Sequence, residues 1–117
     1  PMKTEYPPAP AHLSPNRQEW WHALVREYEL DTHHFDLLQQ AGEAWDRKEG
    51  ARRVLDTDGP TFTDRFGQPK PRPEVAIERD SRLAFARMLR ELALDVVEPG
   101  EEHRAPKISG HAALRVS

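Results

Sequence analysis

The sequence predicts a mainly α-helical fold, in which a helical hairpin is followed by a third helix, with a short extended or hairpin loop between the second helix and the third. Two observations predict this class. Apolar residues recur at helical spacing in three separate stretches, and glycines and prolines gathered in residues 59–73 interrupt that pattern. With 117 residues, of which 37% are hydrophobic, the chain has room for one domain and one small core.

The first helix is predicted to begin at Ser14 and Pro15. A serine side chain can accept hydrogen bonds from the free amides of the first turn, and proline suits the first helical position. The apolar stripe of this helix consists of Trp20, Trp21, Leu24, Val25 and Tyr28. Closely spaced prolines in residues 1–12 predict an extended, poorly packed lead-in, and we interpret Pro1, ahead of Met2, as the remnant of a cleaved tag.

Asp31 or Thr32 can cap a second helix, which is predicted to run to about residue 56. Its apolar side consists of Leu37, Leu38, Ala41, Ala44, Trp45, Ala51 and Leu55. At about 1.5 Å per residue this helix would be roughly 36 Å long, and it offers more apolar face than the first and third helices can cover in one chain. We therefore expect a ring-forming homo-oligomer larger than a tetramer, with Trp45 buried. The residues expected to contribute to oligomerisation are Leu38, Trp45 and Leu55.

Residues 59–72 have the features of neither a helix nor a long strand. Thr61, Phe62 and Thr63 have strand propensity, whereas the glycines and prolines around them break helices. Pro73 can open the third helix, which is predicted to run to about residue 92. Its apolar arc consists of Ile77, Ala84, Phe85, Met88, Leu89 and Leu92.

These elements define the predicted domain organisation. A helical body spans residues 13–94, and residues 95–117 form a flexible C-terminal tail. The tail contains Pro99, Gly100 and Pro106, has mixed charge and shows no helical period. It can therefore bury little apolar surface, and we expect it to be dispensable for folding of the body.

Charge placement indicates where a polyanion would bind. The net charge of −3 argues against a uniformly basic, histone-like protein. Residues 59–72 carry three basic groups and one acidic group, and the third helix gathers Arg79, Arg82, Arg87 and Arg90 within one arc. The alternative for that helix is a solvated face with pairs such as Glu78–Arg82. The candidate DNA-binding residues are Arg65, Lys70, Arg72, Arg79, Arg82 and Arg87.

No pattern in the sequence indicates catalysis or metal binding. The chain has no cysteine, no phosphate-binding glycine loop and no serine in a nucleophile-elbow context. Adjacent His33 and His34 diverge by ~100° on a helix, which favours a capping or surface role over metal ligation. No stretch approaches the ~18 apolar residues of a membrane span. We expect no enzyme activity, no cofactor, no metal site and no membrane partner.

Three stretches together resemble one family of phage proteins. They are Leu13-Ser14-Pro15 ahead of an aromatic helix, the Leu30-Asp31-Thr32-His33-His34 entry into a long alanine-rich helix, and residues 63–76, which run from Thr63-Asp64-Arg65-Phe66-Gly67 into the third helix. In that order they resemble the small subunit of phage terminases, in the family common among siphophages and prophages. The resemblance covers about residues 11–96, and the loop with the third helix is its most specific part.

The resemblance implies a viral DNA-packaging factor that acts in the host cell cytoplasm. Such a subunit forms a ring, binds double-stranded phage DNA near the packaging start, and recruits and regulates the large terminase subunit, which carries the ATPase and nuclease. By the same analogy the tail would dock the large subunit. Two other classes stay open on the residues themselves: an oligomeric adaptor that binds no DNA, and a small transcription regulator, which needs Arg, Asn or Gln at the start of a recognition helix.

Overall fold

A computed structural model describes residues 6–95, with side chains described as far as residue 93. The elements are α1 (Pro15–Glu27), α2 (Thr32–Asp58), β1 (Thr61–Thr63), β2 (Pro69–Pro71) and α3 (Pro73–Asp95). The mainly helical prediction is thus confirmed, and the loop between the second helix and the third is a β-hairpin. Residues 96–117, almost all of the predicted tail, lie outside the described residues.

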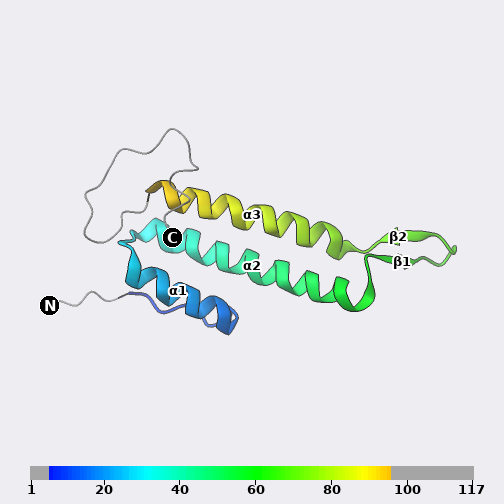
Figure 1. Ribbon diagram of the computed structural model, residues 1–117, viewed down its shortest axis with the longest axis horizontal. Coiled ribbons are helices and arrows are strands. Elements are labelled where there is room, and N and C mark those ends of the chain that lie inside the picture. Colours follow the sequence, from blue (N-terminus) through cyan, green and yellow to red (C-terminus); the bar gives the residue numbers. More distant parts are fainter. Residues whose placement is uncertain (1–5, 96–117) are drawn as a thin grey trace.

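The long helices α2 and α3 run antiparallel and pack along their length, as Figure 1 shows. Helix α1 lies beside the N-terminal half of α2, and the β-hairpin projects from the opposite end of the α2–α3 pair. The main helical hairpin is therefore α2 with α3, joined by the strands. Among residues 6–95, no helix combines the length and apolar character needed to cross a membrane.

Local sequence signals explain where the helices begin. Pro15 occupies the first turn of α1, and the Ser14 hydroxyl accepts a hydrogen bond from the Arg17 backbone amide at 3.3 Å. Asp31 is the N-cap of α2, and its backbone amide donates to Nδ1 of His34 at 2.8 Å. The capping role predicted for the histidine pair is therefore confirmed at His34. Gly59, with a φ of 84°, ends α2 in a conformation that glycine adopts without strain.

The hydrophobic core lies at the end of the molecule far from the β-hairpin. It joins the lead-in, α1, the first half of α2 and the last turns of α3 through Leu13, Trp21, Val25, Leu38 and Leu92. The core is small because the chain is short, and large apolar side chains elsewhere, including Ile77, Leu83 and Phe66, stay exposed.

The lead-in is held more firmly than its prolines indicate. The Trp21 indole Nε1–H donates to the carbonyl oxygen of Pro7 at 3.1 Å, and Ala9 packs against the core. Gln18 Nε2 donates to the carbonyl oxygen of Ala11 at 3.4 Å. The described part of the lead-in is therefore extended but packed, because a tryptophan and a glutamine of α1 provide donors for its carbonyls.

Candidate nucleic-acid interface

A tight turn fixes the tip of the β-hairpin. The Gly67 amide donates to the carbonyl oxygen of Asp64 at 3.0 Å, so Arg65 and Phe66 are the central residues of a β-turn. Asp64 Oδ1 accepts from the amides of Phe66 at 2.8 Å and Gln68 at 2.9 Å. Gly67 follows with a φ of 81°, which suits a three-residue hairpin loop with a glycine bulge.

Cationic and aromatic side chains share the surface of this β-hairpin. The Arg65 guanidinium carbon lies 5.0 Å from the centre of the Phe66 ring, and the Phe66 side chain is 73% exposed. Lys70 stands directly across the strands from Phe62, so these two side chains lie on one face. Within the described part of the chain, neither Arg65 nor Lys70 forms an ion pair with a carboxylate. Both charges are therefore available to a polyanion.

Arg72, the third predicted cation of the loop, has a different environment. It lies at the base of the β-hairpin and is half-buried, and its Nη2 donates to the carbonyl oxygen of Asp58 at 3.3 Å. Its positive charge thus sits beside the last carbonyls of α2, where the helix dipole favours cations. This geometry supports a structural role at the junction of α2 with the β-hairpin.

The four arginines of α3 divide into two pairs. Arg79 Nε lies 3.2 Å from Asp80 Oδ1, and Arg82 Nε lies 3.5 Å from Glu78 Oε2. Arg87 and Arg90 are exposed, and among residues 6–93 no carboxylate forms an ion pair with either of them. The basic face predicted for this helix therefore has cations with acidic neighbours in its first half and, within the described part of the chain, cations without such neighbours in its second half.

The residues predicted to mediate oligomerisation occupy three environments. Leu38 is 1% exposed in the core of a single chain, so any effect on subunit contacts would pass through the position of α2. Leu55 is half-buried near the end of α2. Trp45 is half-buried, and not fully buried as expected, because cationic side chains cover part of its ring while the rest faces a surface groove.

Sequence reasoning missed a cation–aromatic cluster that joins all three helices. We define it as Arg17, Trp20, Trp45, Lys48 and Phe85. The Arg17 guanidinium carbon lies 4.6 Å from the Trp20 ring centre and 4.1 Å from that of Trp45. Lys48 Nζ lies 3.7 Å from the Trp45 ring centre, and the Phe85 ring packs against both tryptophans. The signal was one cation, Arg17, on the apolar stripe of the first helix.

Burial dominates the electrostatics of this cluster. Arg17 is 8% exposed, and desolvation lowers its pKa, although the nearby carboxylates of Asp46 and Glu49 act in the opposite direction. Its Nε donates to the Asn16 side-chain oxygen at 2.8 Å. Because a guanidinium stays charged at any ordinary pH, the aromatic faces around Arg17 act as partners for a buried cation.

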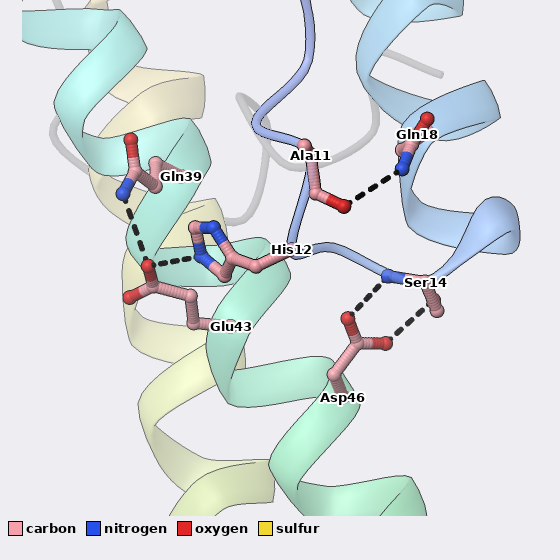
Figure 2. Close-up of polar contacts among 7 residues, drawn as sticks. All are labelled: Ala11, His12, Ser14, Gln18, Gln39, Glu43 and Asp46. Carbon is pink, nitrogen blue, oxygen red and sulfur yellow. Dashed lines mark hydrogen bonds and ion pairs between the residues drawn. The ribbon is translucent and has the colours of Figure 1, made fainter.

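Polar contacts beside the cluster fasten the start of α1 to α2, as shown in Figure 2. The Ser14 amide donates to Asp46 Oδ2 at 2.8 Å, and the Ser14 hydroxyl donates to Asp46 Oδ1 at 2.6 Å. One turn earlier on α2, Glu43 Oε2 accepts from His12 Nε2 at 2.8 Å and from Gln39 Nε2 at 3.0 Å. The Gln39 hydrogen bond, with help from His12, holds the pKa of Glu43 below its ordinary value.

An open groove of about 550 Å³ lies next to these contacts. It is lined by His12, Ser14, Pro15, Asn16, Trp45, Asp46, Glu49 and Arg53. The lining has charges of both signs, and the Asp46 carboxylate is occupied by Ser14. Across residues 6–93, no three histidine or acidic side chains are grouped closely enough to hold a metal ion.

Comparison with family models, with curated proteins and with solved structures finds no match for this chain.

Proposed function

We propose that this protein is a viral DNA-packaging factor, a small terminase subunit that binds phage genomic DNA near the packaging start. In this proposal it recruits and regulates the large terminase subunit, which carries the ATPase and nuclease, and it acts in the host cell cytoplasm without catalytic chemistry of its own. One observation carries the DNA-binding part: the rigid β-hairpin presents Arg65 and Lys70 without carboxylate partners, among the described residues, at the far end of the helical pair.

The second half of α3 offers a second phosphate-binding surface. Arg87 and Arg90 are exposed, whereas Arg79 and Arg82 already have acidic neighbours. Each cation that contacts a phosphate releases a condensed counterion, so affinity falls steeply as salt rises. We rank the β-hairpin first and α3 second, because pairing to Asp80 and Glu78 weakens the attraction of the first two arginines for phosphate.

A ring assembly would multiply these weak contacts. Ile77 and Leu83 are exposed apolar residues of α3, 38% and 57% exposed, and burial of such surface favours association. Repetition of one β-hairpin per subunit converts modest single-site affinity into strong overall binding when several sites engage the same duplex. The ring thus supplies the affinity that the small basic area of one chain lacks.

The test measures the affinity of the protein for a long double-stranded phage DNA at several salt concentrations. Native mass spectrometry measures the size of the assembly. Arg65/Lys70→Ala should weaken binding and flatten the slope of log K against log salt by about 0.9 for each phosphate that the variant no longer neutralises. Arg47/Arg52→Ala, which removes two exposed cations of α2, is the matched control and should leave the slope close to that of the wild type.

The outcomes separate the proposed function from its two rivals. A large assembly with salt-sensitive binding that depends on the β-hairpin supports the terminase proposal. A large assembly that does not bind DNA favours the adaptor. A dimer that binds one short DNA sequence tightly favours a transcription regulator. Stimulation of a large subunit's ATPase by the assembly tests the recruitment half of the proposal.

A further inference from the structure

The tip of the β-hairpin carries an exposed aromatic side chain, that of Phe66. Phe66 is 73% exposed, more than Leu83 at 57% or Phe62 at 40%. It is a central residue of the turn, so its backbone lies at the tip of the strand pair. A large exposed apolar side chain in a position of this kind indicates a contact surface.

The turn fixes the backbone from which this ring projects. Asp64 Oδ1 binds two amides of the loop, and the Asp64 amide also donates to the carbonyl oxygen of Gln68 at 2.9 Å. Gly67 supplies the positive φ that the bulge requires. The backbone of the tip is therefore ordered before any partner arrives, which lowers the entropic cost of binding there.

The outer edge of β2 is unsuited to pairing with a protein strand. Pro69 and Pro71 stand opposite Thr63 and Thr61. The flanking pairs, 64 with 68 and 60 with 72, make the inter-strand hydrogen bonds, so the nitrogens of both prolines face outward. Proline has no N–H, and this edge offers no donor at either position. Contacts on the β2 side of the β-hairpin must therefore come from side chains.

We propose that Phe66 acts as a wedge that enters the minor groove of duplex DNA and partly unstacks one base step. This inference rests on the proposed DNA-binding function and deepens it. Apolar side chains at the tips of narrow projections unstack bases in this way when adjacent cations hold the phosphates, and the duplex bends away from the wedge. Arg65, whose guanidinium lies over the Phe66 ring at 5.0 Å, would follow the ring into the groove, where the negative potential favours arginine.

The charge of the tip favours DNA over a protein surface. Arg65 lies against the Phe66 ring, Lys70 lies farther along the β-hairpin opposite Phe62, and the Asp64 carboxylate accepts hydrogen bonds from amides of the loop. A protein hot spot of this kind would have a broad apolar patch around its anchor, whereas all residues of β1 and β2 other than Phe62 are threonine, proline or lysine. One apolar ring with Arg65 beside it, and with Lys70 farther along the β-hairpin to contact a phosphate, fits a base step of duplex DNA.

The experiment uses the full chain with a duplex of about 30 base pairs that carries a fluorophore at each end and 2-aminopurine at its central steps. Energy transfer between the ends reports bending, 2-aminopurine fluorescence reports unstacking, and anisotropy reports binding. We expect the wild type to raise both signals, and netropsin, which occupies the minor groove, to compete. Phe66→Ala should abolish both signals and weaken binding roughly tenfold, while Phe66→Leu retains part of each.

Tyr6→Ala, which removes an exposed aromatic ring outside the β-hairpin, is the matched control, and helical circular dichroism verifies that every variant folds. If Phe66→Ala bends and unstacks the duplex as the wild type does, the wedge is wrong while the DNA-packaging proposal stands. If the wild type binds no duplex at any salt concentration, both proposals are wrong, and the tip is then a candidate contact for an acidic protein surface.

Discussion

Arg17 shows how one buried cation can join three helices without an ion pair to any carboxylate among the described residues. Its guanidinium lies between the rings of Trp20 and Trp45 and within 5.9 Å of the Phe85 ring centre. A planar guanidinium can stack on two rings at once, whereas a lysine ammonium is a strongly hydrated point charge. Substitution by lysine is therefore not conservative at this position.

Arg17→Ala should lower the free energy of unfolding by about 1–3 kcal/mol, because the variant has no cation to stack on the two tryptophan rings and a cavity forms between them. Arg17→Lys should recover less than half of that stability. Urea denaturation followed by tryptophan fluorescence measures both, and Arg47→Ala serves as the exposed control. A wild-type midpoint for Arg17→Ala would show that the cluster contributes nothing to stability.

Glu43 predicts a pH dependence with a defined sign. Hydrogen bonds from Gln39 and His12 make its pKa lower in the folded chain than in the unfolded chain. Its stabilising effect is therefore fully present above the unfolded pKa and disappears as the pH falls through the folded pKa. Glu43→Gln should destabilise the protein at neutral pH, and the difference from the wild type should shrink between about pH 5 and pH 3.

Urea midpoints across that pH range provide the measurement for Glu43→Gln, with Glu19→Gln on the exposed side of α1 as the control. A difference between Glu43→Gln and the wild type that stays constant from neutral to acid pH would contradict the predicted linkage.

At the scale of single elements, two glycines of α2 should respond in opposite directions to alanine. A Cβ at Gly42 would lie 3.0 Å from Leu13 Cδ1, and Leu13 is buried in the core. A Cβ at Gly50 would meet no atom within 4 Å. Helix propensity favours alanine at both positions by up to about 1 kcal/mol, so only packing distinguishes them.

We expect Gly50→Ala to raise the free energy of unfolding by about 0.5–1 kcal/mol and Gly42→Ala to lower it by about 1 kcal/mol. Thermal unfolding followed by circular dichroism measures both variants under one set of conditions. Stabilisation by Gly42→Ala would mean that Leu13 moves aside at little cost.

The residues at which the elements begin were more predictable from the sequence than the contacts between elements. Ser14 with Pro15, Asp31 and Pro73 each signal a helix start locally, and each prediction is confirmed. The β-hairpin stayed open between two interpretations, because Pro69, Lys70 and Pro71 have no strand propensity. They form a strand because both prolines fall at positions that need no inter-strand donor.

Only the part of the candidate site that depends on the local distribution of charge could be predicted from the sequence. Exposure of Arg65 and Lys70 follows from a short polar loop, which a sequence can reveal. The turn of Arg72 toward Asp58 and the burial of Arg17 between aromatic rings depend on contacts between separate elements. Helical periodicity assigns each side chain to a face, but it does not identify the residue that covers that face.

At the scale of the whole molecule, the small core predicts assembly. The side chains of Ile77 and Leu83 on α3 are 38% and 57% exposed, so the described part of one chain covers them only in part. Native mass spectrometry at micromolar concentration should show a species larger than a tetramer, and Leu83→Asp should shift it to smaller ones. A wild-type monomer or dimer would contradict this prediction. Circular dichroism of the variant checks that its secondary structure is kept.

The position of the core relative to the β-hairpin has a consequence for the order of folding. Asp58 and Pro73, at the ends of α2 and α3 beside the β-hairpin, are close in sequence, whereas Leu38 and Leu92 meet in the core across a much longer stretch of chain. Closing a short loop costs less entropy than closing a long one. Pairing of α2 with α3 should therefore start beside the β-hairpin, where little apolar surface is buried. It should then extend along the two helices toward the core. We therefore expect nucleation at one end of the molecule, while most of the stabilising burial lies at the other.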